Sequence, residues 1–119
     1  MNRKIKFRIW NDYDKKMIYW NELLKQNLPN IFTIPSYDKW LTQYTGLHDK
    51  NGKEIYEGDI VKYRDSTGQH IEKVIFDKGC FYAGMHRGSS TRVAPKLINT
   101  RITEVIGNIY DNSDLLGGE

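Results

Sequence analysis

The chain begins with a strict alternation of basic and apolar residues. The even positions from Lys4 to Arg8 are basic, and the odd positions from Ile5 to Ile9 are apolar. Because the side chains of a strand point alternately to opposite faces, this period of two predicts a half-buried strand over residues 4–10, with the bases on its exposed face. Turn-forming residues at 11–14 and a second apolar run at 17–20 predict an N-terminal hairpin.

Short apolar runs separated by glycine-bearing turns follow along the rest of the chain. The clearest turn is Asn51-Gly52, because both residues tolerate the positive φ that a tight turn requires. We interpret Gly46 and Gly58 as turn positions in the same way. Further strands are predicted at residues 40–44, 60–63, 71–76, 80–82 and 102–110.

Helical signals are few and short. A helix is predicted at residues 21–26 with Asn21 as its N-cap, and a helical turn at residues 93–98 within the otherwise patternless stretch 84–101. The sequence therefore predicts a mainly β fold. A bent antiparallel sheet or a partly open small barrel, with one or two short helices, fits the spacing of the turns.

The composition fits one small domain. A chain of 119 residues with 13% aromatic residues can form a hydrophobic core, so we expect a single domain over residues 1–116 and a frayed tail at 117–119. Cys80 is the only cysteine, which excludes an internal disulfide. No apolar run approaches the roughly 20 residues of a membrane-spanning helix, and the basic start leads into no apolar signal segment. We expect a cytoplasmic protein that binds no membrane.

Charge is segregated along the chain, although the net charge is only +3. Residues 102–119 contain carboxylates and no lysine or arginine, whereas basic residues gather near the N-terminus and in the stretch 78–101. Such separation steers a polyanion towards one face, and it equally allows the basic segments to pair with the acidic end of another copy. A solvated surface of mixed charge is the simpler alternative. The candidate nucleic-acid-binding residues are Arg3, Lys4, Lys6, Arg8, Arg87, Arg92, Lys96 and Arg101.

Signals for catalysis are weak. The histidines at 48, 70 and 86 and Cys80 show no zinc-type spacing, so no metal or other cofactor is expected. No nucleophile motif is present, and the loop from His86 to Ser90 is interpreted as a polar loop rather than an oxyanion site. Glu54, Glu57 and Asp59 would support metal-assisted hydrolysis only if their carboxylates converged on one point. We expect no enzymatic activity.

Two stretches are more specific than any argument from composition. One runs from Gln43 to Val61 around Gly46, Gly52 and Gly58, and the other is the stretch from Glu104 to Asn112 followed by two leucines. With the opening Lys6-Phe7-Arg8-Ile9-Trp10, the chain resembles the YopX family of small proteins encoded by bacteriophages and prophages. The resemblance implies a small β-rich fold and carries over no catalytic or binding residue.

The sequence favours a phage or prophage accessory protein of the bacterial cytoplasm that acts as a non-enzymatic binding module, with nucleic acid as the preferred partner. The alternative is a module that assembles with further copies of itself or binds a host protein. The stretch 84–101 lies outside the resemblance, so its partner would be particular to this chain.

Overall fold

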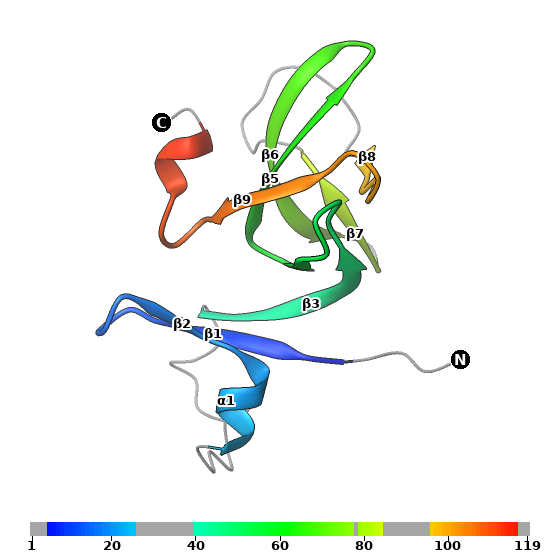
Figure 1. Ribbon diagram of the computed structural model, residues 1–119. Coiled ribbons are helices and arrows are strands. Elements are labelled where there is room, and N and C mark those ends of the chain that lie inside the picture. Colours follow the sequence, from blue (N-terminus) through cyan, green and yellow to red (C-terminus); the bar gives the residue numbers. More distant parts are fainter. Residues whose placement is uncertain (1–4, 26–39, 78, 85–95, 117–119) are drawn as a thin grey trace. The chain divides into compact units, whose positions relative to one another are not determined.

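The predicted strands form two sheets in the computed structural model, which describes residues 5–25, 40–77, 79–84 and 96–116 (Figure 1). One sheet has the strand order β2-β1-β3-β4 and the other has the order β8-β7-β6-β5-β9. Both sheets are antiparallel, and a short α-helix and a 3-10 helix accompany them. The predicted mainly β fold is confirmed. The chain divides into two compact units, Met1–Tyr44 and Thr45–Glu119.

The N-terminal unit contains the predicted hairpin. Strand β1 (Phe7–Asn11) pairs with β2 (Lys16–Ile18) on one side and with the first residues of β3 (Leu41–His48) on the other. Helix α1 (Trp20–Lys25) follows β2 and packs its buried Leu23 against β1. A six-residue helix is too short to be stable alone, so this packing maintains it.

Helix α1 begins one residue before its predicted start. The backbone amides of Glu22 and Leu23 both donate to the carbonyl of Tyr19 at 3.0 Å. Tyr19 is therefore the residue that flanks the first turn, and Asn21 lies inside the helix. The prediction of Asn21 as the N-cap is wrong, because the apolar anchors Trp20 and Leu23 determine where the helix packs.

The C-terminal unit centres on the long strands β5 and β6. These strands are antiparallel to each other, and each has a further antiparallel neighbour, β9 beside β5 and β7 beside β6. A bulge between Ile60 and Val61 interrupts the pairing of β5 with β9, and bulges of this kind bend a strand. The core contains buried Ile55, Val74 and Val105. The elements of this unit are β4 (Glu54–Tyr56), β5 (Asp59–Asp65), β6 (Gly68–Asp77), β7 (Cys80–Ala83), β8 (Lys96–Leu97), β9 (Glu104–Asn108) and η2 (Ser113–Leu116).

The glycines of the central stretch all adopt positive φ. Gly52 (87°) and Gly58 (88°) lie in turns, as predicted. Gly46 has the same backbone conformation, with φ of 88°, but it lies within strand β3 rather than in a turn. The predicted helical turn at 93–98 falls partly outside the described residues, and its positions 96–97 form the short strand β8. The single-domain boundaries stay a prediction.

Candidate functional site

The first predicted basic segment does not present its bases as the alternation suggests. Only 1% of Arg8 is exposed. Its Nε donates to the Thr42 hydroxyl at 3.0 Å, and its guanidinium carbon lies 5.9 Å from the centre of the Tyr19 ring. The expectation that Arg8 lies on a solvated face is wrong, because a hydroxyl and an aromatic ring accommodate the guanidinium inside the structure.

The other members of this segment differ from one another. Lys6 is half-buried, and its Nζ lies 5.1 Å from the centre of the Tyr44 ring, a cation–π contact. Arg3 and Lys4 lie outside the described residues. The structure therefore assembles no row of exposed bases on β1 among the residues it describes.

The second predicted basic segment contributes one described side chain. Arg101 is exposed, in a turn where its backbone N–H donates to the Asn99 side-chain oxygen at 3.1 Å. Arg87 and Arg92 lie outside the described residues, and for Lys96 only the backbone, in β8, is described.

A buried carboxylate binds the Asn-Gly turn to strand β9. Asp49 Oδ1 accepts from the backbone N–H of Asn51 and of Lys53, both at 2.9 Å. Asp49 Oδ2 accepts from the N–H of Val105 at 2.9 Å, across 56 residues of sequence. Sequence reasoning missed this contact. An aspartate just before an Asn-Gly turn is the local signal, because such side chains bond the backbone two residues on.

The electrostatics of Asp49 follow from these bonds. Burial raises the pKa of its carboxyl, but the N–H groups of Val105, Lys53 and Asn51, together with the positive charge of Lys53, more than offset this. The pKa of Asp49 therefore lies below its ordinary value of 3.8. The carboxylate is a structural acceptor, since its oxygens are engaged by backbone donors.

Exposed cations lie on segments next to β9, the strand whose Val105 N–H donates to Asp49. The N–H of Lys50 donates to the carbonyl of Thr103 at 2.9 Å, which places the turn beside the residues that lead into β9. Lys62 on β5 is directly opposite Glu104 on β9, with 4.0 Å between Nζ and Oε1. We define the β9 basic surface by five cations that are exposed or half-exposed on these adjoining segments: Lys50, Lys53, Lys62, Arg64 and Arg101.

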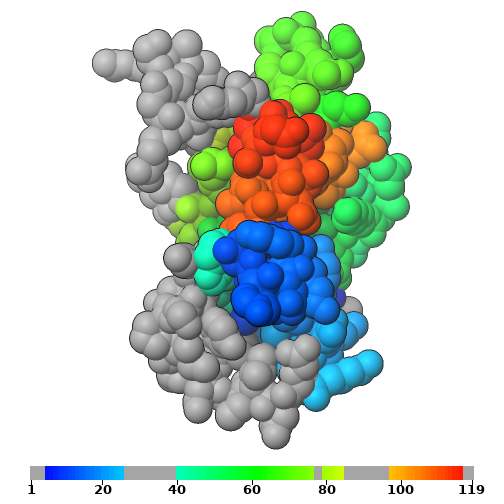
Figure 2. All heavy atoms as spheres, turned by 90° about the vertical axis from the view of Figure 1, so that its left-hand side faces the viewer, coloured from blue at the N-terminus to red at the C-terminus, as the bar shows by residue number. Residues whose placement is uncertain are grey.

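The far end of β9 carries the opposite charge. Asp111 and Asp114 are exposed on the turn and on η2, which follow β9. Figure 2 shows β9 and η2, coloured orange to red, as one continuous surface. Arg101 before β9 and Asp111 and Asp114 after it therefore give the two ends of this strand opposite charges.

The carboxylates considered for hydrolysis are placed as follows in the structure. Asp59 is buried, and its Oδ2 accepts from the N–H of Tyr56 at 2.7 Å. The Glu54 Oε1 accepts from the Tyr56 hydroxyl at 3.3 Å, and Glu57 is half-buried. Across the described ranges, no three His, Cys, Asp or Glu side chains are grouped so that they could hold a metal ion.

A polar cluster at the end of the β5–β6 hairpin was not foreseen. The Thr67 hydroxyl lies 2.6 Å from Asp65 Oδ1 and 2.7 Å from His70 Nε2, and this same nitrogen lies 3.1 Å from Asp65 Oδ1. A catalytic relay needs the histidine to contact the carboxylate and the hydroxyl through different ring nitrogens. Here the same nitrogen, His70 Nε2, contacts both the carboxylate and the hydroxyl, so the cluster stabilises the hairpin and forms no relay.

A family model described as the YopX protein matches residues 6–117, nearly the whole chain. This chain belongs to the YopX family. The crystal structure of protein EF1440 from Enterococcus faecalis is similar, with a TM-score of 0.60 and 23% identity over 97% of this chain and 99% of that chain. At this identity the likeness concerns the fold alone. No curated protein sequence matches the chain.

The two stretches that resemble YopX proteins form one structural module. Strand β5 from the central stretch pairs with β9 from the terminal stretch, and Asp49 bonds Val105. The carbonyl of Gly58 also accepts from the N–H of Ile109 at 2.9 Å. The two stretches on which the resemblance rests are therefore paired with each other in this chain, although they are far apart in sequence.

The terminal YopX stretch also closes on itself. The Asn108 side-chain oxygen accepts from the N–H groups of Tyr110 and Asp111, both at 2.9 Å. The Asn112 oxygen accepts from the N–H of Asn108 at 3.2 Å, and it lies only 2.6 Å from where a Cβ on Gly107 would be. Position 107 thus requires glycine because of this close approach.

None of the helices in the described part of this YopX protein is long and apolar enough to cross a membrane.

Proposed function

We propose that this YopX protein is a phage or prophage accessory protein of the bacterial cytoplasm that binds nucleic acid without catalysis. The observation that carries the proposal is the β9 basic surface, defined above by five exposed or half-exposed cations. They lie on segments that hydrogen bonds and strand pairing bring together, although residues 50 and 101 are far apart in sequence.

The charges of this surface suit a polyanion. Glu104 is the carboxylate facing it from β9, and its oxygen is 4.0 Å from Lys62 Nζ, with both side chains partly exposed. An exposed pair at this distance contributes little, about 0–1 kcal/mol, so Lys62 remains available to a phosphate. Asp49 is buried and engaged by backbone N–H groups. Glu54, which follows Lys53, is half-buried and accepts from the Tyr56 hydroxyl. Arginine and lysine side chains bind phosphate groups through charge-assisted hydrogen bonds.

This surface revises the set of residues named from the sequence. Arg101 belongs to both sets. Lys6 and Arg8 are engaged with aromatic rings, so we assign them no role in binding. Arg3, Lys4, Arg87, Arg92 and Lys96 stay predictions.

The test is retention of the purified protein on immobilised DNA and RNA as salt is raised. Retention at low salt that weakens steeply with added salt is expected, because bound cations displace counterions. The variant Lys50→Gln/Arg101→Gln should bind more weakly, with its salt slope reduced by roughly 2. Absence of retention at low salt would refute the proposal.

A matched control removes the same charge elsewhere. Lys16 and Lys25 are exposed in the N-terminal unit, and Lys16→Gln/Lys25→Gln lowers the net charge by the same two units. This variant should retain nearly the wild-type affinity. Equal losses in both variants would show that net charge, rather than the β9 basic surface, governs binding.

Self-assembly is the second candidate function. Asp111 and Asp114 are exposed beyond the opposite end of β9, so the basic surface of one copy could meet the acidic end of another. Light scattering would then give a mass that exceeds 14.0 kDa and falls towards it as salt is added. A salt-sensitive oligomer without nucleic-acid retention would favour this function over the first.

A further inference from the structure

The outer half of the β5–β6 hairpin is a two-stranded ribbon. Strand β9 pairs with β5 only as far as Lys62, and β7 pairs with β6 only from Val74 onwards. We call residues 63–72 the distal ribbon. Among the described strands, the two halves of this ribbon pair only with each other. Figure 1 shows it extending beyond β7, β8 and β9 of the same unit.

The two faces of the distal ribbon carry different side chains. Directly opposite residues of an antiparallel pair share a face, and Tyr63 opposes His70 on the inner one. The carboxylates Asp65 and Glu72 belong to this inner face by the same alternation. The outer face carries Arg64, Gln69 and Ile71, none of which is acidic, and Lys62 and Lys73 lie on the same face at the base of the ribbon.

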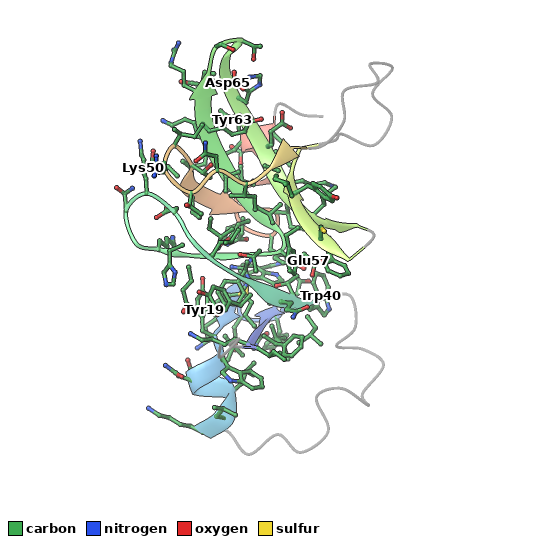
Figure 3. The ribbon with its side chains drawn as sticks, turned by 90° about the vertical axis from the view of Figure 1, so that its right-hand side faces the viewer. Tyr19, Trp40, Lys50, Glu57, Tyr63 and Asp65 are labelled. Carbon is green, nitrogen blue, oxygen red and sulfur yellow. The ribbon has the colours of Figure 1, made fainter. Side chains whose placement is uncertain are left out.

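The inner face stiffens the distal ribbon. The Tyr63 and His70 rings are stacked with centroids 4.9 Å apart. The N–H and the hydroxyl of Thr67 both lie within hydrogen-bond distance of Asp65 Oδ1, at 2.9 and 2.6 Å. Figure 3 shows Asp65 near the end of the hairpin and Tyr63 below it. A two-stranded hairpin alone is marginally stable, so these contacts preorganise a projecting element.

We propose that the distal ribbon enters the major groove of double-stranded DNA, an inference that rests on the proposed function. The major groove of B-form DNA is about 12 Å wide and about 8.5 Å deep, and it admits a two-stranded ribbon. Three residues of β5 extend beyond the last residue paired with β9, which at about 3.3 Å each gives a reach of roughly 10 Å. The reach of the ribbon therefore matches the depth of the groove.

Arg64 and Gln69 are the residues that would contact base edges. They are directly opposite each other in the register, both are exposed, and no hydrogen bond or ion pair of a described residue engages either side chain. The arginine fork matches the two acceptors of guanine, and the glutamine amide matches the donor and acceptor of adenine. The remaining members of the β9 basic surface, Lys50, Lys53, Lys62 and Arg101, would contact phosphates.

The same geometry disfavours other nucleic acids. The major groove of A-form RNA is too deep and narrow for side chains to read, and single strands are held mainly by exposed aromatic rings. On the outer face of the ribbon no aromatic residue is present, since Tyr63 is buried on the inner face.

The test is selection of bound duplexes from a random pool of double-stranded DNA. The wild type should enrich sites that contain a guanine and an adenine, at least about fivefold per position. The variant Arg64→Lys/Gln69→Ala keeps the charge but loses the planar arginine fork and the glutamine amide. It should lose this enrichment, while its salt slope stays unchanged.

Lys16→Arg/Asn21→Ala is the matched control, because it keeps the charge and removes one exposed amide in the N-terminal unit, outside both the ribbon and the β9 basic surface. It should keep the enrichment, and thermal melting should show that both variants are folded. Salt-dependent binding that prefers RNA or single-stranded DNA, or equal enrichment by wild type and ribbon variant, would overturn the inference and leave the proposed function intact. Absence of binding to any nucleic acid would overturn both.

Discussion

Replacement of Asp49 by asparagine tests the contact that joins the central turn to β9. The substitution keeps the size of the side chain but removes its charge and one of its two acceptor oxygens. An asparagine oxygen can still accept from Asn51 and Lys53, but its NH₂ group then faces the N–H of Val105. If the amide is flipped, its oxygen accepts from the N–H of Val105, and its NH₂ group then faces the N–H groups of Asn51 and Lys53.

The magnitude follows from what Asp49→Asn breaks. A hydrogen bond to a charged group contributes about 1.5–3 kcal/mol, and a buried N–H left without an acceptor costs about 1–3 kcal/mol. These two effects overlap, because they concern the same Val105 N–H. We expect a loss of roughly 2–4 kcal/mol, a large part of the 5–15 kcal/mol typical of a domain.

Urea unfolding followed by tryptophan fluorescence measures this loss. With a slope of about 2 kcal/mol per molar, the midpoint should fall by roughly 1–2 M. Asp111→Asn is the control, because Asp111 is exposed and the substitution removes the same charge. Its effect should stay within about 0.5 kcal/mol. Equal midpoints for the two variants would refute the structural role of Asp49.

The pH dependence has a definite sign. The folded-state pKa of Asp49 lies below its ordinary value of 3.8, so the unfolded chain binds the proton more readily. The stabilisation by Asp49 is therefore fully present well above pH 3.8 and is lost as the pH falls through the lower folded-state value. The difference between wild type and Asp49→Asn should shrink over this acid range. A constant difference down to the acid transition would contradict the lowered pKa.

Two further substitutions test packing. Gly107→Ala should lower the stability by about 1–3 kcal/mol, because its Cβ would lie 2.6 Å from the Asn112 oxygen. Adding Asn112→Gly removes the clashing atoms. In urea titrations the double variant should therefore lose less stability than the sum of the losses of the two single variants. Strictly additive losses would argue against the clash. Arg8→Met should cost at least about 1 kcal/mol through the lost bond to Thr42 and leave DNA retention unchanged. Reduced DNA retention by a folded Arg8→Met protein would show that Arg8 contributes to binding.

Local chemistry made several elements predictable. Gly52 and Gly58 adopt the positive φ expected at their turns, because only residues without a branched or bulky side chain tolerate that conformation readily. The strands next to these turns were also foreseen, since a short turn leaves its flanking runs close enough to pair. Gly46 shows the limit of the signal: its φ is positive, yet it lies within β3.

The candidate site was less predictable because it depends on pairing between distant segments. The charge pattern identified Arg101, but Lys50 and Lys62 join it only because the turn and β5 flank β9. Alternation along β1 predicts one solvated face, yet the consecutive residues Arg8, Ile9 and Trp10 are all buried, so both faces of the strand are covered there.

The sequence by itself determined the hairpin of β1 and β2, the long strands β5 and β6, the turns at Gly52 and Gly58 and the family, because these depend on periodicity and on the conformational limits of single residues. Only the tertiary structure decided which carboxylate is buried at Val105, which cations gather around β9 and which hairpin projects. Each of these depends on contacts across many residues, such as the 56 between Asp49 and Val105. Hydrophobic burial and hydrogen bonding select such contacts jointly over the whole chain, so no local pattern encodes them.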